Sequence, residues 1–103
     1  MATRFSPEQR AQQLASLPLW QHDSARDAMS RRFVFADFVQ AFGFMAQLAL
    51  VAERLNHHPE WSNVWNRVDI VLTTHDAKGL TALDIELARQ AETLAARLLE
   101  ARP

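Results

Sequence analysis

The stretch DFVQAFGFMAQLALVAERLNHHP, residues 37–59, decides the fold, because it predicts one long apolar helix with a clear start and a clear stop. Asp37 can cap the start of this helix. At the other end, Pro59 restricts His58 to extended backbone, so we predict that the helix ends at about His57. Between these ends, apolar residues recur at spacings of three and four, as an α-helix requires: Phe38, Phe42, Met45, Ala49 and Ala52.

The same helix carries apolar residues around most of its circumference. A helix with so little polar surface must be covered on more than one side, which favours an oligomer. Gly43 in its interior costs about 1 kcal/mol relative to alanine, and it would be tolerated most easily where another backbone approaches closely. The additional apolar residues are Val39, Phe44, Leu48, Leu50 and Val51.

The residues before this helix predict a first helix and a β-hairpin. Residues 6–9, Ser-Pro-Glu-Gln, have the pattern of a capping box with proline in the first turn, and Pro18 ends that helix. From residue 20 to residue 35, apolar and polar side chains alternate around a turn at residues 24–27. This alternation predicts two short strands.

The residues after the central helix predict a second hairpin and a last helix. Residues 64–73 alternate in polarity and are expected to turn near residues 66–67, with one bent strand as the alternative. Residues 78–79, Lys-Gly, form the next turn, and Thr81 followed by Asp84 resembles a capping box. The stripe of the last helix that we expect to be buried is Leu83, Leu87, Ala91, Leu94 and Leu98.

The order of elements is therefore helix, two strands, helix, two strands, helix. Short links between paired strands imply antiparallel pairing. We predict an α+β fold, α-β-β-α-β-β-α, with a four-stranded antiparallel sheet and three helices packed on one face. With 103 residues, the chain is expected to form a single domain, residues 1–103.

Composition excludes several classes of function. Hydrophobic residues make up 49% and charged residues 22% of the chain, so it can bury a core, while a formal net charge of −1 offers no general attraction for nucleic acid. The absence of cysteine removes thiolate catalysis and cysteine zinc sites.

The most apolar segment, residues 38–55, is interrupted by polar side chains and falls short of the roughly 20 apolar residues of a membrane span. No secretory signal is visible, and we expect a cytoplasmic protein without direct nucleic-acid or membrane binding.

Three histidines are the candidates for chemistry. Glu53 lies four residues before His57, so its carboxylate is expected to reach that imidazole on one face of the helix. Pro59 turns His58 off the helix, so the adjacent pair can line two sides of one cavity. His75 follows a strand, where a third imidazole could converge on the pair. Histidine suits a reaction that needs a proton donor and a proton acceptor near neutral pH.

Simpler interpretations of these residues remain open at this stage. Glu53 could be a solvated helix charge and Asp84 only a capping residue, while Trp61 and Trp65 could be core residues and not a flat wall for a planar heterocycle. A three-histidine zinc site is conceivable. Adjacent histidines diverge in direction, however, and the spacing of helical or strand metal ligands is missing, so no metal is expected.

The combination of Glu53, residues 57–59 (His-His-Pro), Trp65, His75 and Asp84 resembles the signature of the pterin-4a-carbinolamine dehydratases. These proteins are also called dimerization cofactors of a homeodomain transcription factor. The likeness covers roughly residues 17–95. Trp65 stands where many members carry tyrosine, which keeps the position aromatic without a phenolic hydroxyl.

The resemblance implies an activity and a site. The activity is dehydration of 4a-hydroxytetrahydropterin to quinonoid dihydropterin, which recycles tetrahydrobiopterin after phenylalanine or other aromatic amino-acid hydroxylation. The pterin is then the substrate, and no cofactor is expected. By resemblance, His57, His58 and His75 are the catalytic histidines, and the pterin would contact Asn56, His57, His58, Trp61, Thr73, Thr74, His75 and Asp76, with Glu53, Pro59, Trp65 and Asp84 in support.

The resemblance also implies partners. Family members form dimers or tetramers with the long central helix in the contacts, which agrees with the apolar excess of residues 38–55. A functional link to an aromatic amino-acid hydroxylase is expected. The alternative is a non-catalytic role as a protein-binding module or transcriptional coactivator that uses the same apolar helix.

Removing water from the 4a carbon needs one acid and one base and no metal or redox cofactor. We expect His58 and His75 to lie closest to the hydroxyl and N5 of the substrate. His57 would orient the substrate or substitute for one of them.

Overall fold

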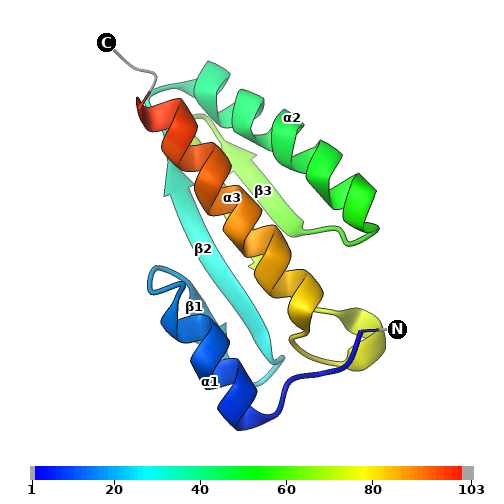
Figure 1. The fold of residues 1–103 in the computed structure, drawn as a ribbon. Helices are drawn as coiled ribbons and strands as arrows, with labels where there is room; N and C mark the ends of the chain where they lie inside the picture. Colours follow the sequence, from blue (N-terminus) through cyan, green and yellow to red (C-terminus); the bar gives the residue numbers. More distant parts are fainter. Residues whose placement is uncertain (1, 101–103) are drawn as a thin grey trace.

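The computed structural model describes residues 2–100, and their order of elements is the predicted one (Figure 1). This part of the chain contains three α-helices, four strands and one short 3-10 helix. The α+β prediction is therefore confirmed. The elements are α1 (Pro7–Ala15), β1 (Gln21–Asp23), β2 (Ala28–Val34), α2 (Phe38–Leu55), β3 (Glu60–Val64), β4 (Arg67–Leu72), η1 (His75–Ala77) and α3 (Ala82–Glu100).

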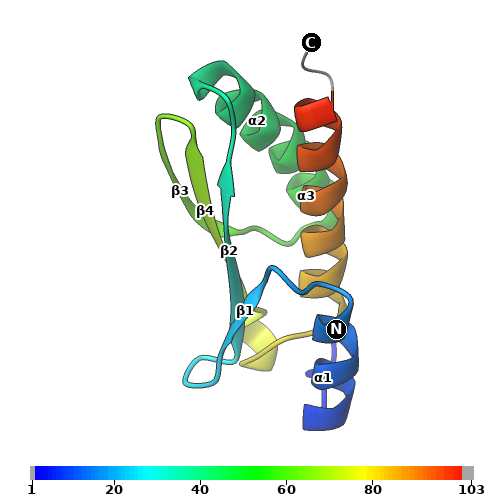
Figure 2. The same ribbon diagram turned by 90° about the vertical axis from the view of Figure 1, so that its left-hand side faces the viewer.

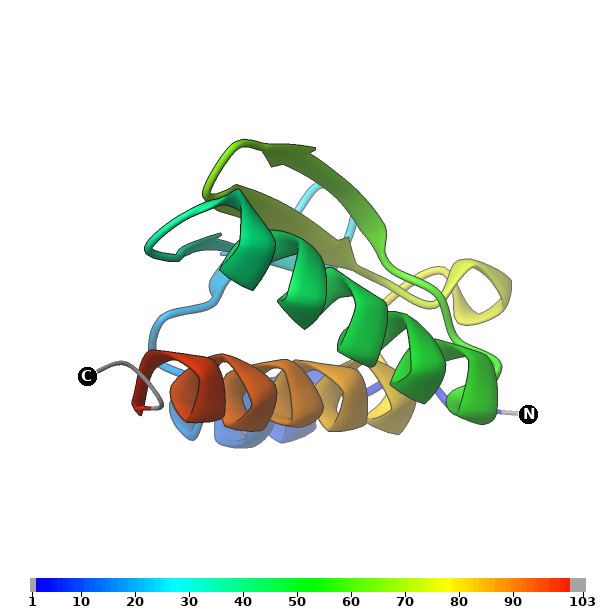
Figure 3. The ribbon, with the colours of Figure 1, turned by 90° about the horizontal axis from the view of Figure 1, so that it is seen from above.

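The four strands form one antiparallel sheet in the order β1-β2-β4-β3. The register of the two central strands places Met29 opposite Leu72 and Phe33 opposite Val68, and all four side chains are buried. The helices lie on one face of the sheet (Figure 2), and α2 and α3 run side by side along it (Figure 3). The core lies between this layer of helices and the sheet.

Predicted caps start the first two helices. The Ser6 hydroxyl accepts a hydrogen bond from the Gln9 N–H at 3.1 Å, and the Gln9 side chain accepts one from the Ser6 N–H at 2.9 Å. The Asp37 carboxylate accepts from the Gln40 N–H at 2.9 Å. Each cap satisfies backbone donors that the first turn of a helix leaves free.

The end of α2 corrects the prediction, because the helix stops at Leu55 and not at about His57. Asn56 adopts the left-handed conformation, with φ 49° and ψ 45°, which asparagine tolerates better than most residues. The His57 N–H still bonds to the Ala52 carbonyl at 3.0 Å, which closes the turn. His57 therefore lies outside the helix, and helical spacing does not relate it to Glu53.

The buried face of α2 differs from the stripe of apolar residues, at spacings of three and four, that predicted the helix. Of that stripe only Ala52 is buried, whereas Phe42 is 58% exposed and Gly43 has no atom within 4 Å of an added Cβ. No backbone of the described chain approaches Gly43 closely, so a close approach by a second chain stays a prediction. The residues of α2 that are buried are Ala41, Phe44, Leu48 and Ala52.

By length and composition α2 could cross a membrane, and it alone among the described helices could do so. This is weak evidence, because core helices of soluble proteins share these properties. The face of α2 that carries Phe44 and Leu48 packs in the hydrophobic core. The apolar excess therefore divides into a core face and an exposed face.

The second hairpin and the last helix agree with the sequence pattern in most details. Strands β3 and β4 are joined by a tight turn at Trp65-Asn66, one residue before the predicted position. In α3, Leu87 and Ala91 are buried as expected. Leu94 and Leu98 are partly buried against the core, and Leu83 is only half-buried.

Replacing Leu48 by alanine should lower the free energy of unfolding by about 2–5 kcal/mol, because it removes methyl groups from a fully buried site. Leu19→Ala is the matched control, since Leu19 is 63% exposed, and it should change stability by less than about 0.5 kcal/mol. Urea denaturation at pH 7 measures both. Equal losses in the two variants would contradict the assigned core.

Candidate functional site

Seven of the eight residues predicted to contact the substrate line a cleft between the end of α2, η1 and the start of α3. The cleft has a volume of about 250 Å³. A second hollow of similar volume adjoins it and shares Asn56, Thr74, Asp76 and Leu83. The structure thus brings together the two histidine segments that are far apart in the sequence. The cleft is lined by Asn56, His57, His58, Thr73, Thr74, His75, Asp76 and Leu83.

His57 is the buried histidine of the cleft, with 8% of its surface exposed. Its Nε2 lies 2.5 Å from Oδ1 of Asp84, which is fully buried. The other oxygen, Oδ2, accepts hydrogen bonds from the Thr74 hydroxyl at 2.8 Å and from the Thr81 N–H at 2.9 Å. Asp84 is therefore both the predicted capping residue and the partner of a cleft histidine.

The bonds of Asp84 determine how His57 is presented. Both carboxylate oxygens act as acceptors, so Nε2 of His57 is the donor in their bond. Within residues 2–100, no buried side-chain nitrogen or oxygen lacks a hydrogen-bond partner, and Nδ1 of His57 makes no hydrogen bond. Nδ1 therefore reaches the solvent of the cleft, and in the neutral imidazole it carries the lone pair.

His58 pairs with Glu53, which corrects the expected pairing of Glu53 with His57. The distance between His58 Nε2 and Glu53 Oε1 is 2.9 Å. The left-handed turn at Asn56 is the reason, since it takes His57 inward to Asp84 and leaves His58 beside the last turns of α2. Both partners of the His58 pair are exposed.

His75 pairs with a carboxylate that sequence analysis did not identify. Its Nε2 lies 3.0 Å from Oε2 of Glu60, the first residue of β3. Arg26, in the turn between β1 and β2, donates two hydrogen bonds to the same carboxylate, at 2.8 and 3.0 Å. Hydrogen bonds from Arg26 and His75 lower the pKa of Glu60 to about 2. No local pattern links residues 26, 60 and 75, so only the fold could reveal this group.

A second buried carboxylate supports the wall of the cleft. The backbone carbonyl of Asp27 accepts a hydrogen bond from the Thr73 hydroxyl at 3.1 Å, and its side chain accepts one from the Leu80 N–H at 3.2 Å. His22 and Arg4 bind the same carboxylate at 2.7 and 2.9 Å. Burial alone would raise the pKa of Asp27, but the hydrogen bonds from His22 and Arg4 hold it below its usual range. Asp27 therefore holds both ends of the segment that contains His75, the Thr73 end through its backbone carbonyl and the Leu80 end through its carboxylate.

The two tryptophans are not among the residues that line the cleft. Trp61 is partly buried and packs against the hydrophobic core. Trp65 lies in the turn at the far end of the β3-β4 hairpin and is 64% exposed. The expected aromatic wall is therefore not formed by these residues within one chain. Leu83, which was expected only as a core residue, lines the cleft instead.

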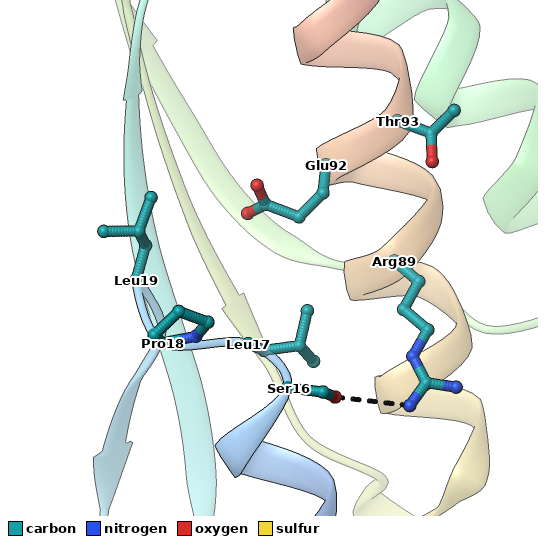
Figure 4. Close-up of a pocket in the computed structure, with 7 residues that line it drawn as sticks. All are labelled: Ser16, Leu17, Pro18, Leu19, Arg89, Glu92 and Thr93. Carbon is teal, nitrogen blue, oxygen red and sulfur yellow. Dashed lines mark hydrogen bonds between the residues drawn. The ribbon is translucent and has the colours of Figure 1, made fainter.

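A larger cavity, of about 460 Å³, lies elsewhere, between the end of α1 and the middle of α3 (Figure 4). Three of its polar side chains, Ser16, Arg89 and Glu92, are already paired. Arg89 donates to the Ser16 hydroxyl at 3.3 Å, and Glu92 accepts from Trp20 and forms an ion pair with Arg31. Because no histidine converges there, the smaller histidine cleft is the better candidate for proton transfer.

Metal ligands do not gather in the described part of the chain. No group of three or more His, Asp or Glu side chains between residues 2 and 100 is arranged to hold a metal ion. Each cleft histidine instead has its own carboxylate partner. The expectation of a site without metal stays a prediction.

Fold and cleft together define a class: a small α+β protein whose cleft presents several imidazoles, each hydrogen-bonded to a carboxylate. Comparison with known proteins then makes the assignment specific. The chain belongs to the pterin 4 alpha carbinolamine dehydratase family, whose model matches residues 3–94. The family resemblance noted in the sequence is thereby confirmed.

Individual relatives agree with this assignment. A protein of Bradyrhizobium diazoefficiens is 56% identical over 92% of this chain and 95% of its own length, and one of Rhizorhabdus wittichii is 59% identical over 88% and 94%. Both carry the provisional name pterin-4-alpha-carbinolamine dehydratase.

Two solved structures share the fold. The crystal structure of a transcriptional coactivator/pterin dehydratase from Brucella melitensis is 48% identical, with a TM-score of 0.87 over 90% of this chain and 99% of that one. A pterin dehydratase-like protein identified as a RuBisCO assembly factor in the alpha-carboxysome is 23% identical, with a TM-score of 0.66 over 74% of this chain and 88% of that one. The second likeness concerns the fold alone.

Asp84→Asn should lower the free energy of unfolding by about 1–3 kcal/mol. The carboxylate accepts hydrogen bonds from three buried donors, and the NH₂ group of asparagine, itself a donor, would face one of them. Glu86→Gln, on the exposed side of the same helix, is the control and should stay within about 0.5 kcal/mol of the native chain. Urea denaturation measures both. An Asp84→Asn protein as stable as the control would show that the network does not depend on the carboxylate.

Proposed function

We propose that this protein is a dehydratase that converts 4a-hydroxytetrahydropterin to quinonoid dihydropterin and water. The observation that carries the proposal is the set of three imidazoles in one cleft, each paired through Nε2 with a different carboxylate. Such pairs orient imidazoles for proton transfer. Family membership supplies the pterin as the substrate class.

The proposed reaction is the loss of one molecule of water without a change of oxidation state. The C4a–O bond breaks as the hydroxyl takes a proton and leaves as water. Removal of the N5 proton lets the nitrogen electron pair form the C4a–N5 double bond. One proton is donated and one is accepted, so two histidines are enough and the chemistry requires no cofactor.

We assign the proton transfers to His58 and His75 and an orienting role to His57. Burial and the bond to Asp84 support a fixed role for His57. His58 and His75 are exposed and reach the cleft from separate segments, which suits groups on two sides of a bound ring. His57, with Nδ1 in the cleft, could substitute for either of them.

The remaining polar groups of the cleft are proposed to bind the pterin. Asn56, Thr73 and Asp76 line it, and Asp76 can accept hydrogen bonds from the amino and ring N–H groups of a pterin. Thr74 also lines the cleft, but its hydroxyl already donates to Asp84. Trp61 is proposed as a contact only if a second chain or a movement of β3 brings it to the cleft.

Self-association is proposed for the exposed face of α2. Phe38 and Phe42 pack against each other at 5.8 Å between ring centroids, and Val39 and Leu50 are the most exposed large apolar residues of the helix. Covering this face with a second copy would remove apolar surface from water. We propose a homodimer or homotetramer in the cytoplasm that serves an aromatic amino-acid hydroxylase.

A protein-binding role is the second candidate, and the same apolar face favours it. The name of the Brucella relative includes transcriptional coactivator as well as pterin dehydratase. A partner helix could occupy the face formed by Phe38, Val39 and Phe42. This role does not require the histidine cleft, so the two candidates can be tested separately.

His75→Ala is expected to lower the rate of dehydration by about 100-fold, which is the lower end of the range of rate losses for removing one acid-base group. Stopped-flow absorbance with freshly generated 4a-carbinolamine measures the rate. Glu86→Gln is the control, because Glu86 is exposed on α3 and does not line the cleft. Full activity in His75→Ala would refute the assignment of His75, and an inactive native protein would refute the dehydratase proposal.

The double variant Val39→Glu, Phe42→Glu is expected to be monomeric, because self-association would bury the two new charges in an apolar contact. Multi-angle light scattering after size-exclusion chromatography measures the mass. Gln12→Glu, on the exposed side of α1, should leave the mass unchanged. A native protein that is monomeric throughout the micromolar range would contradict self-association.

A further inference from the structure

We propose that Glu60 is a positioning residue for His75 and that Arg26 acts through Glu60 to hold that imidazole at the cleft. The inference rests on the proposed dehydratase function and extends it to two residues outside the cleft. Neither Glu60 nor Arg26 lines the hollow that the three histidines share. Both would act on the reaction only through His75.

The geometry connects three segments that the chain separates widely. Arg26 lies in the β1-β2 turn, Glu60 begins β3, and His75 begins η1. The two Arg26 bonds go to different oxygens of Glu60, Oε1 and Oε2, and His75 binds Oε2. Two parallel bonds between guanidinium and carboxylate fix the plane of the carboxylate as well as its distance. The direction of the bond to His75 is therefore defined.

His75 needs such a partner more than the other histidines do. Its side chain is 71% exposed, so packing does little to select its rotamer. His57, by contrast, is enclosed and bound to the buried Asp84. A mobile imidazole spends only part of its time in a reactive position, and a hydrogen bond that restricts it raises that fraction. Glu60 is the side chain that makes this bond.

The charge of Glu60 selects the tautomer of His75. Because Arg26 and His75 hold the pKa of Glu60 near 2, the carboxylate is ionised at neutral pH and acts only as an acceptor. Nε2 of His75 must then carry the hydrogen in their bond. In the neutral imidazole the lone pair is on Nδ1, which is left free to exchange a proton with the substrate.

Stability is a poor alternative explanation for the group. Exposed ion pairs contribute little to stability, and Arg26 and Glu60 are both substantially exposed. The sheet contains a matched pair for comparison, Arg32 with Asp69, which is similarly exposed and also makes two hydrogen bonds. That pair contacts no histidine, so its loss reports the structural contribution alone.

The test compares Glu60→Gln, Arg26→Met and the control Arg32→Gln in the full chain. We expect Glu60→Gln to lower kcat by about tenfold with KM within about twofold, because positioning is part of the acid-base contribution. Arg26→Met should have a smaller effect in the same direction. Glu60→Asp, which restores the charge, should recover part of kcat, and Arg32→Gln should match the native protein.

The ring nitrogens of His75 provide a readout that does not depend on activity. ¹⁵N spectra at neutral pH should show the hydrogen on Nε2 of neutral His75 in the native chain and a mixture of tautomers in Glu60→Gln. An unchanged tautomer together with an unchanged kcat in Glu60→Gln would overturn the proposal. If the native protein has no dehydratase activity, the spectra still decide whether Glu60 positions His75, and only the proposed function fails.

Discussion

The buried carboxylate of Asp84 is the interaction on which the site depends. It joins the start of α3 to the end of β4 through Thr74 and to the segment after α2 through His57. Its bonds to the His57 ring and the Thr81 N–H satisfy buried donors, and a buried donor left without a partner costs about 1–3 kcal/mol. One side chain therefore couples the stability of the fold to the position of a cleft histidine.

The backbone after α2 explains how two adjacent histidines serve different carboxylates. Left-handed geometry at Asn56 ends the helix and turns His57 toward the interior, while Pro59 keeps His58 extended beside α2. Gly79, which pairs with Thr74, is required for a different reason. A Cβ there would lie 2.2 Å from the Asp27 carboxylate, so this close approach needs glycine.

The sequence predicted the order of elements, the caps of α1 and α2 and the two hairpins, because each depends on residues close together in the chain. The family resemblance placed His57, His58 and His75 at one site, and the cleft contains all three. The sequence pattern misassigned the partner of Glu53, since one left-handed residue changed the local geometry. Glu60 and Arg26 were missed because the bond between Glu60 and His75 spans 15 residues and the bonds between Arg26 and Glu60 span 34 residues of sequence.

The central helix shows a different kind of limit. Its periodicity predicted a helix correctly, but apolar residues on two faces cannot show which face meets the core. Only the fold shows that the face with Phe44 and Leu48 meets the core and that the face with Phe38 and Phe42 is exposed. A Cβ at Gly43 would meet nothing within 4 Å, so the helix has room for close approach on its outer side. The excess of apolar residues is then divided between a face that packs in the core and an exposed face, which the proposed self-association would cover.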